Sequence, residues 1–452
     1  MELVAYANRL PVSRGRQGWR PSGGGLVAAL RPALEREGGT WVGWDGGASD
    51  VPKRAQDLEL ELRPVALSRR EVDDYYHGFS NRTLWPLLHG LIEQPVFERR
   101  WWHAYRDVNE RFAGVGAGAD ALHWVHDYHL MLVPSLLRRA GASGPIGFFL
   151  HVPFPPPEIF ARLPWRERVL DGLLGANAVS FQTEAHRDNF VRTCARLHDD
   201  VTVSGETIHL DGRRIRTAAH PISIDARAYA EQARAGGVER HLSALHRQFG
   251  SRSVLLGVDR LDYTKGIIER LRALELLLEQ RPALRGRIAL LQIAVPSRGE
   301  VREYRELRRS VEELVGRING RFTTSGGDVP VYYHYRGIPP ERLLAYYRLA
   351  DVCLVTPLAD GMNLVAKEFV VAQGAAGGAG VLVLSEFAGA AAQLREALPC
   401  NPFDVEALAG TIELALELEE DDRRSRIRRM AAAVAKQDVY QWLDRELRAL
   451  RN

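Results

Sequence analysis

The chain has 452 residues, 46% of them hydrophobic, which suits a globular protein of about three domains or of two large ones. Its 60 basic and 57 acidic residues leave a net charge of +3, and this near balance argues against a nucleic-acid-binding protein. Three scattered cysteines fit neither a disulfide framework nor a zinc site, so we expect a reducing cytoplasm. The sequence shows no signal peptide and no apolar run of about 18 residues, so we expect no membrane partner.

The first half of the chain alternates short apolar runs with helical patterns. Apolar strands that alternate with helices are typical of a parallel sheet covered on both faces. The predicted strands are 3–7, 41–44, 121–126, 146–150 and 178–181, the predicted helices are 26–37, 130–139 and 184–197, and residues 12–20 are predicted as a polar loop.

Two stretches of this half allow two interpretations each. The glycines at 23–25 open the predicted helix 26–37, where a phosphate could bind, but a plain flexible loop fits equally well. Residues 73–85 mix aromatic and polar side chains. Tyr75, Tyr76 and Trp85 could floor a sugar pocket, although burial in the core is the favoured interpretation.

Polar groups follow two strands of the predicted sheet where those strands end. Asp127 follows strand 121–126, and His151 follows strand 146–150. Ligands of open α/β sheets bind outside the carboxyl ends of the strands. A structural histidine and a binding site are therefore equally good interpretations of this edge.

A second alternating series follows residues 220–225, which we interpret as a domain boundary. Two α/β domains in tandem are the simplest explanation of this repetition. The helical stretch 226–248 comes first, then strands 254–258, 288–294, 331–335, 352–356 and 381–384 alternate with helices 266–278, 301–315, 340–349 and 363–373, and residues 404–452 are helical.

Charged residues flank the turns of this second series. Arg260 and Lys265 flank the turn after strand 254–258, where two cations beside a helix start suit a diphosphate. The chain has only four lysines, which favours a functional role for Lys265 over a surface ion pair. Helix 363–373 starts after Asp360 and carries Glu368, and carboxylates there could hold sugar hydroxyls around a bound phosphate.

Arg298 follows strand 288–294 and either holds a second anionic group or pairs with Glu300 or Glu303. The sequence has no P-loop and no HExxH motif, and it offers no evident nucleophile–base pair. Cations and hydroxyl-binding groups thus dominate the candidate site.

Together the motifs resemble the trehalose-6-phosphate synthases, the retaining GT-B glycosyltransferases of family 20. The resemblance covers nearly the whole chain, and the motifs occur in order. They are NRLP at 8–11, GGGL at 23–26, GGTWVGW at 38–44, YYHGFSNRTLWP at 75–86, HDYHL at 126–130, GFFLHVPFPPPEIF at 147–160, FQTE at 181–184, RLDYTKG at 260–266, PSRGE at 296–300, GRING at 316–320, TPLADGMNLVAKEFV at 356–370, VLSEFAGAA at 383–391 and NPFD at 401–404.

The resemblance implies an α/β fold of two Rossmann-like domains that face each other across a cleft. Residues 1–222 would bind the acceptor, with a C-terminal helix at about 436–452 packing back on them, and residues 223–435 would bind the donor. The implied reaction moves glucose from a nucleotide-glucose to glucose 6-phosphate with retention, gives trehalose 6-phosphate and needs no metal or other cofactor.

The resemblance also implies roles for individual residues. Glu368 would hold the donor ribose, and Asp360 and His151 would contact the transferred glucose. The residues nearest the chemistry would be Asp127, His151, Arg260, Lys265 and Asp360. The donor-binding set would be Gly24, Gly25, Arg260, Lys265, Ile338, Asp360, Gly361, Met362, Asn363, Leu364, Val365 and Glu368, and the acceptor-binding set Arg9, Tyr76, Trp85, Asp127 and Arg298.

Alternatives remain for substrate and role. A relative of the same fold could use another phosphorylated acceptor such as glycerol 3-phosphate, and a non-catalytic sugar-phosphate sensor is a further alternative. The sequence of segment 335–338, where the family contacts the base, does not indicate whether the donor is UDP-, GDP- or ADP-glucose. The expected partners are these small molecules, with a homo-oligomer possible and a separate phosphatase acting downstream.

Overall fold

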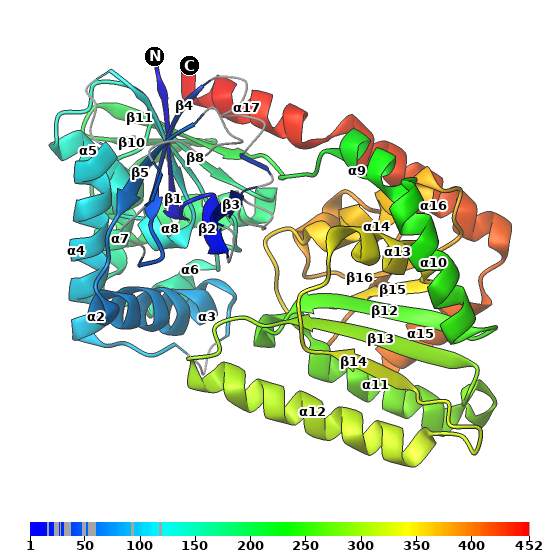
Figure 1. Ribbon diagram of the computed structural model, residues 1–452. Coiled ribbons are helices and arrows are strands. Elements are labelled where there is room, and N and C mark those ends of the chain that lie inside the picture. The colour runs from blue at the N-terminus through cyan, green and yellow to red at the C-terminus, as the bar shows by residue number, and fades with distance from the viewer. Residues whose placement is uncertain are drawn as a thin grey trace. The chain divides into compact units, whose positions relative to one another are not determined.

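The structure is a computed structural model that describes residues 1–15, 18–21, 27, 29–30, 38–47, 51–52, 60–91, 95–116 and 120–451 (Figure 1). The chain divides into two compact units. Unit 1 comprises Met1–Ile222 and Val439–Asn452, and unit 2 comprises Ser223–Asp438. No helix among the described residues is long and apolar enough to cross a membrane.

Unit 1 is built on a mainly parallel sheet. Its central strands are buried along their whole length, which explains why their sequences read as continuous apolar runs. In spatial order the described strands are β5 (Leu60–Val65), β4 (Gly39–Trp44), β1 (Leu3–Arg9), β6 (Leu122–His126), β7 (Ile146–Phe149), β8 (Ala178–Phe181), β11 (Arg213–Ala219), β10 (Thr207–Leu210) and β9 (Thr202–Ser204), and pairings with β10 are antiparallel.

Helices pack on both faces of this sheet. The Tyr6 hydroxyl donates to the carbonyl of Gly116, the last residue of α4, at 2.8 Å. On α17, the Trp442 ring lies 5.5 Å from Trp124 and 5.3 Å from Phe149, so the C-terminal helix completes the core of unit 1. Helices α4 (Arg99–Gly116), α5 (Val133–Arg139), α8 (Glu184–Leu197) and α17 (Val439–Arg451) contact its strands, whereas α6 (Pro157–Phe160) packs on α8 and α7 (Arg166–Leu173) packs on α5 and α8.

The stretch 73–85 lies in an unusual helix. A capping box at Ser68 starts α2 (Arg69–Glu71), which continues as the π-helical segment η1 (Val72–Leu84) and ends in α3 (Trp85–Leu88). Tyr75 is fully buried and Trp85 is 4% exposed, so the core interpretation is confirmed for both. Tyr76 keeps part of its ring exposed.

One predicted element was wrong, and two others have different bounds from those predicted. Within residues 12–20, β2 (Val12–Gly15) and β3 (Gly18–Pro21) form a hairpin in place of a loop. The predicted helix 130–139 is present as α5, but it starts at Val133, after a 3₁₀ turn at Tyr128–Leu130, and it has proline in its first turn. The helical stretch predicted at 226–248 is confirmed, and it consists of two helices, α9 (Ala226–Ala233) and α10 (Gly236–Phe249).

The antiparallel edge β9–β10–β11 was not predicted, because its strands are short and rich in polar residues. The predicted helix 26–37 falls mostly outside the described residues. The other predicted strands and helices of unit 1 are present with ends shifted by a few residues.

Unit 2 has a fully parallel sheet. The strand order reverses beside β12 (Ser253–Arg260), which has β13 (Ile288–Val295) on one side and β15 (Val352–Val355) on the other. The carboxyl ends at such a switch point are where ligands bind in open α/β sheets. The full order of the described strands is β14 (Val331–His334), β13, β12, β15, β16 (Val381–Ser385) and β17 (Leu398–Cys400).

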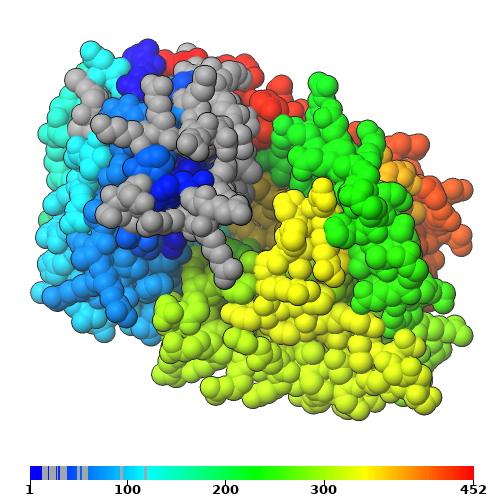
Figure 2. Space-filling view, viewed as in Figure 1, coloured from blue at the N-terminus to red at the C-terminus, as the bar shows by residue number. Residues whose placement is uncertain are grey.

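The helices of unit 2 form a layer on each face of the sheet (Figure 1). On one face, α11 (Ile267–Gln280), α12 (Arg302–Phe322) and α15 (Val405–Glu417) bury Leu271, Leu314 and Ile412 in one apolar cluster. The other face carries α9, α10, α13 (Pro340–Leu349), α14 (Leu364–Ala375) and α16 (Glu420–Lys436). Helix α10 lies along α13 at the surface (Figure 2).

Candidate active site

The turn after β12 is organised around Asp262, a fully buried carboxylate. It accepts hydrogen bonds from the Thr264 amide at 3.0 Å and from the Tyr304 hydroxyl at 2.8 Å. Arg298 Nη1 lies 3.1 Å from Asp262 Oδ2, the oxygen that also accepts from Tyr304. Burial alone would raise the pKa of Asp262, but Arg298, Arg260 and Lys265 outweigh it and lower that pKa to about 2. Asp262 therefore stays ionised and holds the turn.

Lys265 and Asp360 join the turns after β12 and β15. Lys265 Nζ lies 2.5 Å from Asp360 Oδ2, and the same oxygen accepts from Asn363 Nδ2 at 3.1 Å. Gly266 makes this approach possible: its φ is +63°, and a Cβ there would lie 2.0 Å from the Thr356 carbonyl oxygen. The turns that follow β12 and β15 therefore meet at the switch point of the sheet.

A buried arginine braces the same two turns from below. Arg270, on α11, is fully buried and donates from Nη1 to Asp259 at 2.7 Å and to Gln292 at 2.8 Å. Its Nε donates to the Thr356 hydroxyl at 3.1 Å. We did not predict this brace from the sequence. The signal for it was the presence of two polar residues, Asp259 and Gln292, inside apolar strands.

The start of α14 presents its first amides at this site. Asn363 is the N-cap residue, with φ at 75°, and its side chain accepts from the Ala366 amide at 3.3 Å. Gly361 and Met362 are buried just before it, and Leu364 and Val365 form the first helical residues. A helix start with unpaired N–H groups favours a phosphate.

Two further residues of α14 have shifted pKa values. Burial raises the pKa of Glu368, although hydrogen bonds from Tyr347, at 2.8 Å, and from Tyr229 counteract it. Burial lowers the pKa of Lys367 to about 7. The two tyrosines fix the orientation of the Glu368 carboxylate, and the sequence alone did not indicate them.

The remaining predicted residues of unit 2 lie at the same carboxyl edge of the sheet. Arg260 is the exposed last residue of β12. Arg298 follows β13 with a positive φ of 47°, and its guanidinium contacts Asp262 and Tyr304. Ile338 lies in the loop after β14 and is partly exposed.

In unit 1, Asp127 and His151 meet at the ends of β6 and β7. Asp127 has a positive φ of 74°, and its Oδ1 accepts from the His151 amide at 3.3 Å. His151 Nε2 lies 3.2 Å from His126 Nδ1. Burial lowers the pKa of His151 to about 3, and burial together with His151 lowers the pKa of His126, so both imidazoles are neutral near pH 7.

An aromatic cluster surrounds Arg9 at the end of β1. The Arg9 guanidinium carbon lies 4.5 Å from the centroid of the Trp44 ring and 5.4 Å from that of Tyr76. The Tyr76 ring stacks on His129, with centroids 5.8 Å apart. An exposed arginine held against aromatic rings suits a phosphate group. Trp44 and His129 were not predicted.

The structure therefore groups the predicted residues into two sets, one at the carboxyl edge of each sheet. Trp85 lies beneath the surface of unit 1, with its ring 5.6 Å from Tyr128. Gly24 and Gly25 lie outside the described residues. Among the residues that the structure does describe, no group of three or more His, Cys, Asp or Glu side chains could hold a metal ion.

The chain matches the family model of glycosyltransferase family 20 over residues 2–452. It belongs to glycosyltransferase family 20. A trehalose-6-phosphate synthase of Mycobacterium avium is 45% identical over 470 residues, which cover 99% of this chain and 95% of the relative. Family 20 membership confirms the resemblance that the motifs indicated.

Solved structures of similar proteins have the same fold. An α,α-trehalose-phosphate synthase (UDP-forming) from Burkholderia xenovorans in complex with glucose-6-phosphate has a TM-score of 0.91 at 37% identity, over 100% of both chains. An E. coli structure bound with UDP-2-fluoro glucose has a TM-score of 0.92 at 37% identity, over 100% of this chain and 99% of that one. The predicted α/β, GT-B fold class of family 20 is thereby confirmed.

Proposed function

We propose that the chain is a retaining glucosyltransferase that moves glucose from UDP-glucose to glucose 6-phosphate and forms trehalose 6-phosphate. The observation that carries this proposal is the meeting of Arg260, Lys265 and the α14 N-terminus at the switch point of unit 2. Cations and free amides at that point suit a nucleotide diphosphate. The similar UDP-forming synthase and the structure with a UDP-glucose analogue support uracil as the base of the donor.

Unit 2 would bind the donor in this proposal. Lys265 and Arg260 would neutralise the diphosphate, and the amides of residues 362–365 would receive it at the start of α14. Glu368, oriented by its two tyrosines, would hold the ribose, and Asp360 would hold a hydroxyl of the glucose. Gly24, Gly25 and Ile338 complete the predicted donor set.

Unit 1 would bind the acceptor. Arg9, with Tyr76 beside it, would pair with the phosphate of glucose 6-phosphate, and Asp127 would accept hydrogen bonds from its hydroxyls. We keep Trp85 and Arg298 as predicted members of this set. A neutral His151 would donate a hydrogen bond to the transferred glucose without adding a charge.

In the reaction the anomeric oxygen of glucose 6-phosphate forms a bond to C1 of the donor glucose, and the bond from C1 to the diphosphate breaks. UDP leaves from the face that the acceptor enters, and its phosphate takes the acceptor proton. Lys265 and Arg260 would stabilise the negative charge that grows on the leaving diphosphate. No covalent enzyme intermediate and no metal is required in this scheme.

The test offers UDP-, GDP- and ADP-glucose in all combinations with glucose 6-phosphate and glycerol 3-phosphate, and identifies the product by NMR. The proposal expects α,α-linked trehalose 6-phosphate, formed fastest from UDP-glucose and unaffected by EDTA. Product from glycerol 3-phosphate alone would establish the alternative acceptor, and ligand binding without any product would establish a sensor. We further propose that the chain works in the cytoplasm, that it can form a homo-oligomer, and that a separate phosphatase acts on its product.

A further inference from the structure

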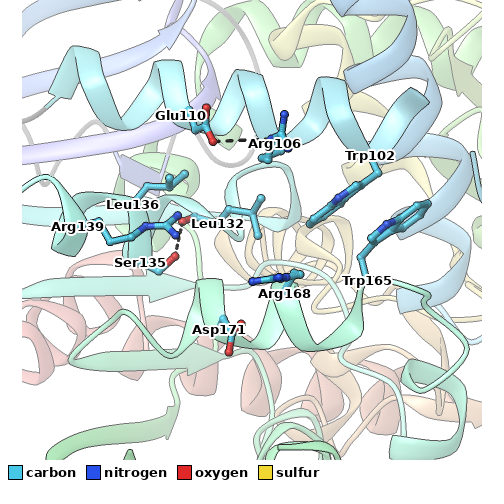
Figure 3. A pocket seen from close by; sticks show the side chains of 10 residues that line it. All are labelled: Trp102, Arg106, Glu110, Leu132, Ser135, Leu136, Arg139, Trp165, Arg168 and Asp171. Atoms are coloured by element: carbon cyan, nitrogen blue, oxygen red, sulfur yellow. Dashed lines mark hydrogen bonds and ion pairs between the residues drawn. The ribbon is translucent and has the colours of Figure 1, made fainter. Parts of the chain in front are cut away.

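Unit 1 contains a groove that is separate from all predicted site residues. It has a volume of about 400 Å³ and lies between α4, α5 and α7 (Figure 3). Pockets that hold small ligands have volumes of about 300–1,000 Å³, so this groove suits a small molecule at the lower end of that range.

One end of the groove is a rigid aromatic wall. The rings of Trp102 and Trp165 stack with centroids 5.3 Å apart and planes 8° apart. Phe79 of η1 supports both rings from behind, at 5.5 Å and 5.6 Å. Trp102 is 8% exposed, so the packing has already fixed its position. Such a wall offers a flat apolar surface to the ring of a sugar without ordering new side chains.

The groove also contains two arginines without an internal partner. Arg139 and Arg168 line it and form no hydrogen bond or ion pair with any residue that the structure describes. Figure 3 shows Arg168 between the tryptophan wall and Arg139. Arg106, by contrast, pairs with Asp107 at 2.8 Å. Two free guanidinium groups facing one cavity suit a phosphate, which each can bind through two N–H groups.

Carboxylates complete the lining. Glu110 and Asp171 lie in the same groove, and Asp171 also lies 3.1 Å from His198. Carboxylate oxygens accept hydrogen bonds from hydroxyl groups. A flat apolar wall, two free arginines and hydroxyl acceptors together match a sugar that carries a phosphate.

Hydrogen bonds join helix α4, which lines the groove, to the turn that follows Asp127. Asn109 of α4 donates to the His129 carbonyl at 3.1 Å and accepts from the Leu132 amide at 3.2 Å. Leu132 itself lines the groove. Tyr105 of α4 donates to the Tyr128 carbonyl at 2.8 Å. A ligand that moved α4 against α5 would therefore act on the turn that follows Asp127.

We propose that this groove is a second ligand site for a small phosphorylated sugar, and that its occupancy changes the affinity of unit 1 for the acceptor. The site itself is independent of the reaction. The regulatory half rests on the proposed function, because it assigns Asp127 to the acceptor.

The binding test uses titration calorimetry with ribose 5-phosphate, ribose and inorganic phosphate. Ribose 5-phosphate should bind at least tenfold more tightly than ribose or inorganic phosphate, because only ribose 5-phosphate can contact the aromatic wall and the two arginines at once. Equal binding of inorganic phosphate would overturn the sugar assignment. No binding of ribose 5-phosphate to an enzyme with full turnover would overturn the site and leave the proposed function intact.

Variants assign the bound probe to the groove. The double variant Arg139→Gln/Arg168→Gln should weaken ribose 5-phosphate at least tenfold, whereas Arg214→Gln, an exposed arginine on β11, should not change it. Arg9→Gln should also leave binding unchanged. Loss of binding in Arg9→Gln with full binding in the double variant would place the probe in the acceptor site and overturn the proposal.

Turnover tests the regulatory half. Ribose 5-phosphate should change the KM for glucose 6-phosphate in the natural enzyme but not in the double variant, whose kcat without effector should be unchanged. By linkage, glucose 6-phosphate should shift the Kd of ribose 5-phosphate by the same factor. Binding without any shift in KM or Kd would overturn regulation. Absence of turnover in the natural enzyme would instead count against the proposed function, since the calorimetry needs no reaction.

Discussion

Lys265 Nζ lies 2.5 Å from Asp360 Oδ2, although the two residues stand on turns that follow different strands. Each side chain is almost buried, so each neutralises the other's charge where water has little access. The pair joins the turns after β12 and β15 at the switch point of unit 2. A donor that needs either group must therefore replace part of this contact when it binds.

Removing the lysine should lower catalysis more than stability. We expect Lys265→Met to reduce kcat by about 10²–10³, because the proposed donor site would lose one fixed positive charge beside the leaving diphosphate. The control is Lys436→Met, an exposed lysine at the end of α16, which should keep full turnover. Steady-state kinetics checks this, and a kcat of Lys265→Met within twofold of the natural enzyme would contradict the donor assignment.

The Arg270 brace should matter first for stability. Arg270→Met leaves Asp259 as a buried charge without its partner, so we expect a loss of about 3–5 kcal/mol in the free energy of unfolding of unit 2. Arg272→Met, an exposed arginine on the same helix, should change it by less than about 0.5 kcal/mol. Urea unfolding followed by circular dichroism distinguishes the two, and similar midpoints would show that the brace contributes little.

Lys367 should make stability depend on pH in the alkaline range. Its folded pKa of about 7 lies below the ordinary value of 10.5, so the folded protein binds fewer protons than the unfolded chain between these values. Stability from this group therefore falls as the pH drops from about 10 to about 7 and changes little below that. The full effect is on the order of 4–5 kcal/mol.

The variant Lys367→Met isolates this effect. Its stability relative to the natural protein should rise as the pH is lowered from about 10 to about 7, and thermal melts across that range measure it. Lys436→Met, in which an exposed lysine is removed, should show no such trend. A difference that stays constant with pH would mean that Lys367 keeps an ordinary pKa.

His151 should act as a neutral group throughout the working range. Because burial lowers its pKa to about 3, protonation of this imidazole cannot produce a limb in kcat/KM between pH 5 and 8. His151→Asn should lower kcat while the shape of the pH profile stays the same, and His103→Asn, an exposed histidine on α4, should change neither. A limb near pH 6.5 that disappears in His151→Asn would contradict this.

The sequence indicated most of the sheet and much of the site because both depend on local patterns. Buried parallel strands read as continuous apolar runs, and the polar residue after each run lies at the ligand-binding edge. Asp127 and His151 were predicted as site residues this way, whereas Lys265 and Asp360 were predicted from the turns that follow strands 254–258 and 352–356. Gly266 shows the limit, since only the 2.0 Å approach to Thr356 reveals why a side chain cannot stand there.

Other features depend on contacts between distant residues. Arg270 reads as an ordinary surface arginine of a helix, and only folding brings it to Asp259, Gln292 and Thr356. The π-helical segment η1 has no distinct residue pattern, and the edge strands β9 to β11 alternate too many polar residues to stand out. The aromatic residues around Arg9, which are Trp44, Tyr76 and His129, come from three separate segments of the chain. Their grouping around Arg9 could therefore not be predicted from a local sequence pattern.

Helix α17 has a consequence for how the chain is made. Its residues Trp442, Glu446 and Leu450 are buried in unit 1, yet the ribosome adds them only after the whole of unit 2. Unit 2 is contiguous in sequence and can fold as soon as it emerges, whereas residues 1–222 wait with Trp124 and Phe149 uncovered until synthesis reaches α17. Unit 1, whose first 222 residues are translated before unit 2, therefore completes its folding after unit 2. Its uncovered aromatic surface is where chaperones would bind or aggregation would begin.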